Sequence, residues 1–226
     1  MDIPYKIYQL RVGDEDIWNY TYLIINELNH KAIIIDPAWE LEKITGLLKQ
    51  LKVELSAILL THSHYDHTNL VESLTGLYDL KVYMSAVEIE CYEFNCKNIN
   101  SIEDLEVLSI EGIKITCLLT PGHTEGGMCY LVKDSLFTGD TLFIEGCGIC
   151  DGDGGNPEKM YESIQRIKQI IPLNTRIYPG HSFGKKPGLQ LSDLMKENIY
   201  CLIENKKTFV DFRMRKINNN RKFDFK

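Results

Sequence analysis

Five of the six histidines in this chain lie in three short segments, two of which share the pattern Pro-Gly-His. These segments are His62-x-His64-x-Asp66-His67, Thr120-Pro121-Gly122-His123 and Tyr178-Pro179-Gly180-His181. A further carboxylate, Asp140, follows the run Phe137-Thr138-Gly139. Imidazole nitrogens and carboxylate oxygens are ligands that zinc prefers in proteins. The residue types and their grouping therefore predict a metal centre.

The spacing within the first segment predicts two metal ions. His62 and His64 are two residues apart, so they can face the same side where a strand ends. Asp66 and His67 follow as the chain turns into a helix, so they would serve a second ion. We assign the ligands as follows: His62, His64 and His123 to the first metal, Asp66, His67 and His181 to the second, and Asp140 as a carboxylate shared by both.

A centre of this kind favours hydrolysis of an ester or thioester. Two zinc ions close together can share a water and lower its pKa from about 16 towards 7. A thioester releases a thiolate, whose conjugate acid has a pKa of roughly 8.5, so no strong general acid is needed. Asp66 is the expected catalytic residue, because it can orient the nucleophile as well as bind metal. Iron or manganese would also suit these ligands.

The elements around these segments are buried strands and amphipathic helices. Apolar β-rich runs at Ala32–Ile35 and Leu55–Leu60 predict buried strands, and helical spacing covers Trp39–Leu51 and His67–Tyr78. We also expect strands at Ile3–Val12, Tyr20–Ile25, Lys81–Met84, Ile113–Leu119, Met128–Val132, Ser135–Thr138 and Arg176–Tyr178, and helices after Ser85, at Glu158–Ile170 and at Ser192–Asn205. Strands that are apolar on both faces imply helices covering the sheets. Periodicity alone allows either two packed sheets flanked by helices or one open doubly wound sheet.

The bulk composition suits one globular α/β domain spanning residues 1–226. The chain has 226 residues, of which 44% are hydrophobic and 25% charged, and its net charge is −7. The negative charge argues against a nucleic-acid partner. The N-terminus, Met1-Asp2-Ile3-Pro4, is not a secretory signal, and no apolar run approaches the roughly 20 residues needed to cross a bilayer. We therefore expect a soluble cytoplasmic protein with no membrane partner; its oligomeric state stays open.

The charge is unevenly distributed, because a basic tail occupies residues 206–226. This tail holds eight basic residues against Asp211 and Asp224. It is either a solvated terminal segment or a landing patch for an acidic partner.

The seven cysteines show no regular framework, so we expect reduced thiols. Cys147 and Cys150 form a single C-x-x-C pair, which we interpret as ordinary loop cysteines near the substrate entrance.

The ligand pattern resembles the metallo-β-lactamase superfamily over residues 55–184. The resemblance implies an αββα sandwich with a dinuclear site at the sheet edge, here with a short C-terminal helical segment. The stretch Leu136–Phe143 with Cys147-Gly148 and Tyr178-Pro179-Gly180-His181 resembles the glyoxalase II branch. The zinc-dependent hydrolases of bacterial polyketide biosynthesis are similar over nearly the whole chain, through Ile35-Asp36-Pro37-Ala38-Trp39, Glu145–Cys150, Glu158-Lys159-Met160 and Phe212–Lys216.

The resemblance implies a thioester carried by an acyl carrier protein. Glyoxalase II members follow Cys-Gly with a basic residue and then an aromatic one, which contact glutathione. Here those positions hold Ile149 and Asp151, which cannot pair with the carboxylates of glutathione. We therefore expect Ile149 to line the substrate site and the basic residues Arg213, Arg215 and Lys216 to attract an acidic carrier protein, with help from Lys185 and Lys186.

The same residues are compatible with three alternatives. The chain could be a glyoxalase II-type hydroxyacylglutathione hydrolase, a persulfide dioxygenase with one iron, or a catalytically silent scaffold that only binds metal. A true β-lactamase is disfavoured because those enzymes often have Cys where Asp140 stands. Flavodiiron oxidoreductases replace the second histidine by Glu, so His64 argues against them.

Overall fold

Two six-stranded sheets are the frame of the structure, a computed structural model that describes residues 3–14 and 17–215. The first sheet has the order β1-β2-β3-β4-β5-β6, in which β1, β2 and β3 are antiparallel and β3 to β6 are parallel. Its strands are β1 (Tyr5–Gly13), β2 (Trp18–Asn26), β3 (Lys31–Ile35), β4 (Glu54–Leu59), β5 (Lys81–Ser85) and β6 (Ile99–Ile102).

The second sheet has the order β12-β11-β10-β9-β8-β7. Its pairs are antiparallel except for β10 with β11, which run parallel. Its strands are β7 (Val107–Ile110), β8 (Ile113–Leu119), β9 (Met128–Val132), β10 (Ser135–Gly139), β11 (Arg176–Pro179) and β12 (Leu189–Gln190).

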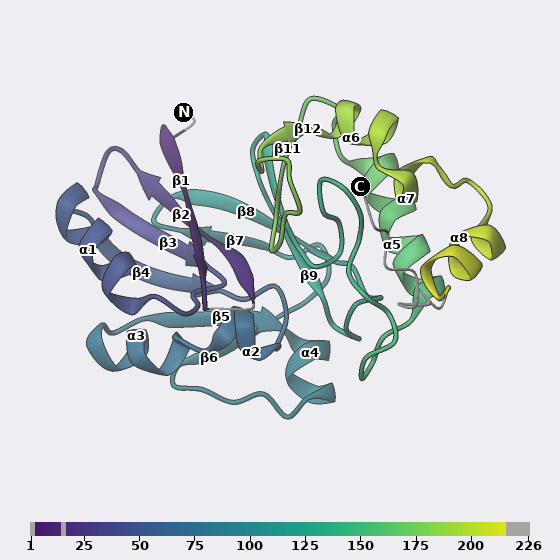
Figure 1. Ribbon diagram of the computed structural model, residues 1–226. Coiled ribbons are helices and arrows are strands. Elements are labelled where there is room, and N and C mark those ends of the chain that lie inside the picture. The colour runs from purple at the N-terminus through teal and green to yellow at the C-terminus, as the bar shows by residue number, and fades with distance from the viewer. Residues whose placement is uncertain (1–2, 15–16, 216–226) are drawn as a thin grey trace, which may run out of the picture.

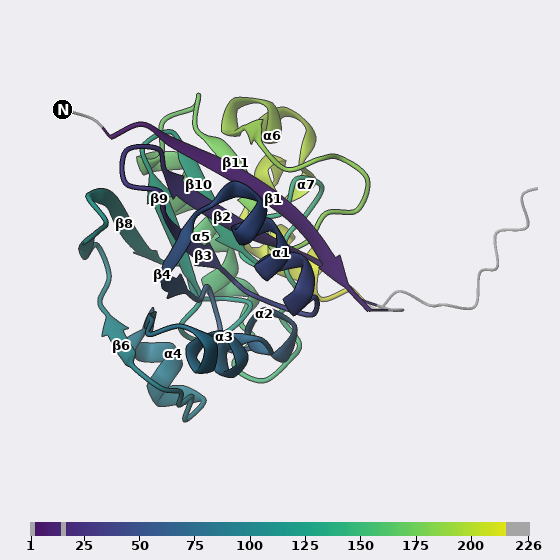
Figure 2. The same ribbon diagram turned by 90° about the vertical axis from the view of Figure 1, so that its left-hand side faces the viewer.

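Helices cover the outer face of each sheet, as Figure 1 shows. Helices α1 (Leu41–Leu51), α2 (Tyr65–Thr68), α3 (Val71–Leu77) and α4 (Ala86–Cys91) lie beside the first sheet. Helices α5 (Pro157–Ile170), α6 (Leu191–Glu197), α7 (Ile199–Leu202) and α8 (Lys206–Arg213) lie beside the second. Figure 2 views the molecule from the side of α1 and α3, with the second sheet and α5 behind them.

The core has three layers because the buried strands are apolar on both faces. In β3, Ala32 and Ile34 pack outward under α1, whereas Ile33 and Ile35 pack between the two sheets. Phe137 of β10 joins the layer between the sheets, and Leu136 packs outward under α5. This layering confirms the predicted αββα sandwich and excludes the open doubly wound sheet.

Two helix starts form as the sequence predicts. Ser85 caps α4 by accepting a hydrogen bond from the backbone of Glu88, and Pro157 occupies the first turn of α5. None of the helices in the described residues is long and apolar enough to cross a membrane.

Two predicted helices are wrong in extent. The helix expected over His67–Tyr78 is divided at Asn69–Leu70 into α2 and α3. The helix expected over Ser192–Asn205 is divided at Asn198, whose buried side chain caps α7 and donates to the carbonyls of Phe143 and Gly146. In both places tertiary hydrogen bonds take precedence over continuous helical spacing.

Candidate metal centre

All the predicted ligands follow the end of a strand, in a loop or, for Asp66 and His67, in the short helix α2. The segment 62–67 follows β4, His123 follows β8, Asp140 follows β10 directly, and His181 follows β11. Loops at one edge of a rigid sandwich can present side chains to a common point. The seven predicted ligands are brought together in this way, from both sheets.

The first group consists of His62, His64 and His123. One ligand atom from each lies within 4.8 Å of the others. Nε2 of His123 is 3.0 Å from Nδ1 of His64. Burial, together with the neighbouring His67, lowers the pKa of His62 well below its ordinary value. His62 is therefore neutral, which is the form that binds metal.

The second group consists of Asp66, His67 and His181, whose ligand atoms also lie within 4.8 Å of one another. Oδ2 of Asp66 is 3.3 Å from Nε2 of His181 and 3.6 Å from Nε2 of His67. Burial would raise the pKa of Asp66, but the hydrogen bond with His181 and the charge of His67 lower it below its usual range. This carboxylate is therefore ionised.

Asp140 lies between the two groups. Its Oδ1 is 3.5 Å from Nε2 of His67, and its Oδ2 is 3.5 Å from Nε2 of His123 and from Nε2 of His181. Within the described part of the chain, neither Oδ1 of Asp140 nor Nε2 of His62 has a hydrogen-bond partner, although both are buried. Buried polar atoms without partners are rare in proteins. These atoms and the surrounding donor set fit two metal ions bridged by a carboxylate.

In four of the five histidines, the ring nitrogen that points away from the other ligands, Nδ1, is hydrogen-bonded to another group. Nδ1 of His181 is 2.8 Å from the carbonyl of Trp18, and Nδ1 of His123 is 2.8 Å from the carbonyl of Ile149. A carbonyl only accepts, so each Nδ1 carries the proton and each Nε2 is free to bind metal. Such outer partners orient metal-binding histidines in proteins generally.

Asp36 orients the other two of these histidines, His67 directly and His62 through Thr61. Its carboxylate accepts hydrogen bonds from the backbone and hydroxyl of Thr61 and lies 3.0 Å from Nδ1 of His67. Because the Thr61 hydroxyl donates to Asp36, it must accept from Nδ1 of His62, 3.0 Å away. Asp36 also falls in a candidate ligand group with His62 and His67. Its existing partners make it an outer support.

Two buried polar residues that the sequence did not single out support the ligands. Asn19 donates from Nδ2 to Oδ2 of Asp66 at 2.9 Å, and its Oδ1 accepts from the indole of Trp39 at 3.0 Å. Glu88 accepts from the backbone and hydroxyl of Ser63 at 2.8 Å and from the backbone of Gly126 at 3.0 Å. Glu88 thus joins the His62–His64 segment to the loop of His123. Their signal in the sequence is weak, because each is an isolated polar residue far from the ligands it supports.

Glycine is required beside two of the ligands. A side chain at Gly180 would come within 2.5 Å of Oδ1 of Asp140 and 2.6 Å of Cε1 of His67. Gly122 has φ +139°, and a side chain there would meet the backbone of Met160 at 2.4 Å.

The residues predicted to bind substrate differ in their placement. Ile149 is 54% exposed beside His123. Arg213 is partly buried and donates to the hydroxyl of Tyr200, and Arg215 is exposed over the ring of Phe212. Lys216 lies outside the described residues.

The sequence predicts that Cys147 and Cys150 lie near the substrate entrance, but they do not. Their side chains are buried in the apolar cluster under α5 and α7, near Arg213. Burial raises the pKa of Cys150 to about 11, and the pKa of Cys147 is also well above its ordinary value. Both are packing residues.

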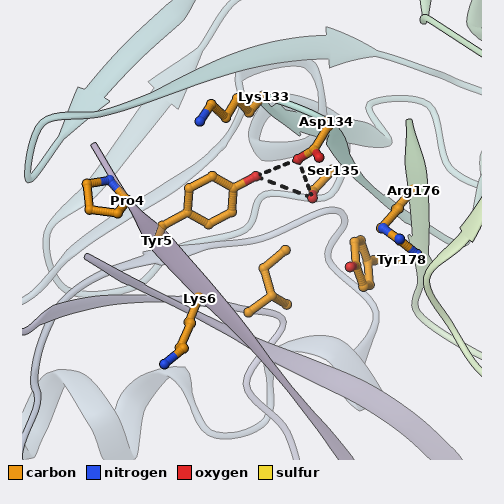
Figure 3. Close-up of a pocket in the computed structure, with 9 residues that line it drawn as sticks. Pro4, Tyr5, Lys6, Lys133, Asp134, Ser135, Arg176 and Tyr178 are labelled. Atoms are coloured by element: carbon orange, nitrogen blue, oxygen red, sulfur yellow. Dashed lines mark hydrogen bonds between the residues drawn. The ribbon is translucent and has the colours of Figure 1, made fainter. Parts of the chain in front are cut away.

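A larger hollow lies at the opposite strand ends, where β1, β10 and β11 begin (Figure 3). Its volume is about 450 Å³. Tyr5 spans it and donates to Oδ1 of Asp134 at 3.0 Å and to the carbonyl of Val132. The hollow contains none of the predicted ligands, so the chemistry belongs to the metal centre.

Comparison with known proteins agrees with this geometry. The model of the metallo-beta-lactamase superfamily matches residues 19–181. The chain is 51% identical, over the full length of both, to the "Probable polyketide biosynthesis zinc-dependent hydrolase PksB" of Bacillus subtilis. It is 36% identical to a hydroxyacylglutathione hydrolase of Dictyostelium discoideum, over 74% of this chain and 63% of the relative. The crystal structure of ETHE1 from Myxococcus xanthus superposes with a TM-score of 0.80 at 27% identity, covering 92% of this chain and 89% of the other.

Proposed function

We propose that this chain, which belongs to the metallo-β-lactamase superfamily, hydrolyses acyl thioesters of an acyl carrier protein in polyketide biosynthesis. The coarser statement, that it is a zinc-dependent hydrolase, follows from its likeness to a full-length relative of that name. The observation that carries the finer proposal is the apolar position beside the metal centre. This position is Ile149, whose side chain is exposed and whose backbone carbonyl accepts a hydrogen bond from His123.

Zinc is the cofactor that this ligand set fits. His62, His64 and His123 would hold one ion, Asp66, His67 and His181 the other, and Asp140 would bridge them. When bound, the two ions supply an acidified water and polarise the carbonyl of the substrate.

Asp66 is the proposed catalytic residue. Asn19 donates to its Oδ2, which fixes the orientation of the carboxylate, and the Asp66 side chain is partly exposed. An ionised carboxylate in this position can orient water by accepting its hydrogen bond. The reaction adds water across the thioester and yields a carboxylic acid and a free thiol. The sulfur leaves as a thiolate, which takes up a proton afterwards, so the protein needs no separate acid.

Basic residues on the loop that follows His181 could contact an acidic carrier protein. Lys185 and Lys186 are exposed there, and Lys185 pairs with Glu197. Arg215 adds an exposed charge at the end of α8. Carrier proteins are acidic, so the charges of Lys186 and Arg215 would favour encounter even though the chain carries −7 overall.

The test compares kcat/KM for an acetylated acyl carrier protein with that for lactoyl-glutathione, on enzyme of measured zinc content. We expect the carrier-protein thioester to be hydrolysed faster. Faster hydrolysis of lactoyl-glutathione would instead establish the glutathione hydrolase activity that the 36% identical relative bears in its name. Full zinc content without hydrolysis of either thioester would indicate a silent scaffold.

A further inference from the structure

Exposed aromatic side chains gather around the metal centre. Among the described residues, three aromatic side chains are largely exposed: Phe183 at 73%, Tyr65 at 73% and Trp18 at 45%. Each belongs to a segment that carries or contacts a predicted metal ligand: Phe183 to the loop after β11, Tyr65 to the start of α2 and Trp18 to the start of β2. Exposing a large apolar side chain to water is unfavourable, so aromatic groups concentrated at one place indicate a binding surface.

Phe183 is tied to the second metal group through His181. The two rings are stacked, with centroids 6.5 Å apart and planes at 24°. The buried ring of Phe143 lies edge-on to both, 5.8 Å from His181 and 5.6 Å from Phe183. Phe183 therefore extends an aromatic surface from a metal ligand to the solvent.

Trp18 and Tyr65 border the same group. The carbonyl of Trp18 accepts from His181, and its ring lies 4.4 Å beneath the guanidinium of Arg11. Tyr65 stands between His64 and Asp66 in the sequence, and its ring packs edge-on against Trp39 at 5.9 Å. Arg11 and Trp39 hold these two rings in place.

The three aromatic residues lie next to metal ligands, where an apolar chain attached to a bound substrate could contact them. The carbonyl of a bound thioester has to lie at the metals, so the first atoms of its acyl chain must lie near the ligand side chains. Two exposed apolar residues are next to those ligands: Phe183, whose ring stacks on His181, and Ile149, whose backbone carbonyl contacts His123. A short polar acyl group would leave this surface in water, whereas an aliphatic chain would cover it.

We infer that Trp18, Tyr65 and Phe183 form an acyl-binding rim that selects thioesters with an extended aliphatic acyl chain. The inference rests on the proposed thioesterase function, which it deepens by naming the class of acyl group.

The test is a series of S-acyl pantetheines from acetyl to octanoyl, assayed on zinc-loaded enzyme. We expect kcat/KM to rise with chain length, by up to about fourfold for each methylene that the rim buries. Phe183→Ala should flatten this dependence, so that the octanoyl-to-acetyl ratio falls about tenfold or more. Phe183→Leu, which keeps an apolar group, should recover part of the ratio. Leu28→Ala is the matched control, because Leu28 is 68% exposed and distant in sequence from every ligand.

A second readout does not depend on turnover. The chain has two tryptophans, Trp18 at the rim and Trp39 packed against Tyr65, so their fluorescence reports on this surface. A non-hydrolysable S-octyl pantetheine thioether should change it with a dissociation constant at least tenfold lower than that of the S-ethyl compound. Phe183→Ala should remove that difference while zinc content, measured by atomic emission, stays at two per chain.

The outcomes separate the two proposals. If no acyl pantetheine and no acyl carrier protein is hydrolysed, the thioesterase function fails. If thioesters are hydrolysed but chain length has no effect, or Phe183→Ala slows every chain length equally, the acyl-binding rim is refuted and the function stands.

Discussion

At the scale of single residues, the centre depends on which nitrogen of each histidine is already occupied. The carbonyls of Trp18 and Ile149 accept from His181 and His123, and Asp36 and Thr61 hold His67 and His62. The inward nitrogens are then left to face one another in a buried space. Because these hydrogen bonds already fix the orientation of the rings, the histidines lose little conformational freedom when they bind metal.

Asp140 is the residue on which both groups depend. Asp140→Ala should reduce zinc content below two per chain and lower kcat for thioester hydrolysis by at least 100-fold, because the alanine removes the oxygens between His67, His123 and His181. Atomic emission after gel filtration measures the metal, and circular dichroism controls for folding. A variant that keeps full activity would overturn the bridging assignment.

Glu88 is a positioning residue for the first group. Glu88→Gln puts an amide donor where Ser63 or Gly126 already donates, so one buried donor loses its partner. We expect about 1 to 3 kcal/mol less stability in urea unfolding. The zinc dissociation constant should rise about 10- to 100-fold.

Glu90→Gln is the matched control for Glu88, because Glu90 is exposed on the same helix. It should leave both quantities unchanged. Equal effects of the two substitutions would show that the helix, and not the buried carboxylate, is responsible.

At the scale of elements, the sequence predicts most of what carries the ligands. The buried strands β3, β4, β8 and β10 are apolar runs followed by polar, glycine or proline residues, so a short stretch of sequence is enough to predict each of them. The short strands β6, β7 and β12 were not predicted. β6 and β7 are edge strands with one well-buried residue each, so their formation depends on neighbours distant in sequence. Glu88 and Asn19 escaped prediction for the same reason, since their partners are 25 and 47 residues away.

Helix α8 shows how composition can conceal an element. The tail that contains it is basic, which favours a solvated segment, yet Lys206–Arg213 is helical and Asn205 caps it. Its anchor is Phe209, which is fully buried against Tyr161 and Tyr200 at ring distances of 5.4 and 5.3 Å.

Phe209→Ala tests whether α8 is part of the folded core. The cavity left between α5 and α7 should cost about 3 to 5 kcal/mol in the free energy of unfolding. Lys207→Ala on the same helix removes only an exposed, solvent-screened ion pair with Asp211 and should leave the free energy of unfolding almost unchanged. Denaturant unfolding compares them, and equal small losses would mean that α8 is only loosely attached.

At the scale of the whole molecule, the metal centre joins the two sheets. His62, His64, Asp66 and His67 follow a strand of the first sheet, whereas His123, Asp140 and His181 follow strands of the second. Each proposed metal takes ligands from both sides, so two ions would cross-link the sandwich at one edge. The apolar layer between the sheets holds them together elsewhere, through residues such as Ile33, Tyr130 and Phe137.

Removal of the metals should therefore weaken the molecule most where the sheets meet at this edge. A ligand that binds only the folded state stabilises it by about 4 kcal/mol when present at 1,000 times its dissociation constant. We expect chelation to lower Tm markedly and to speed amide exchange at the ends of both β4 and β11, with little change at α1, which packs on the far side of the first sheet. Added zinc should restore Tm, whereas magnesium should not, because it prefers oxygen ligands. If Tm and exchange are the same with and without zinc, the metals do not cross-link the sheets, and the sandwich is held together by its apolar layers alone.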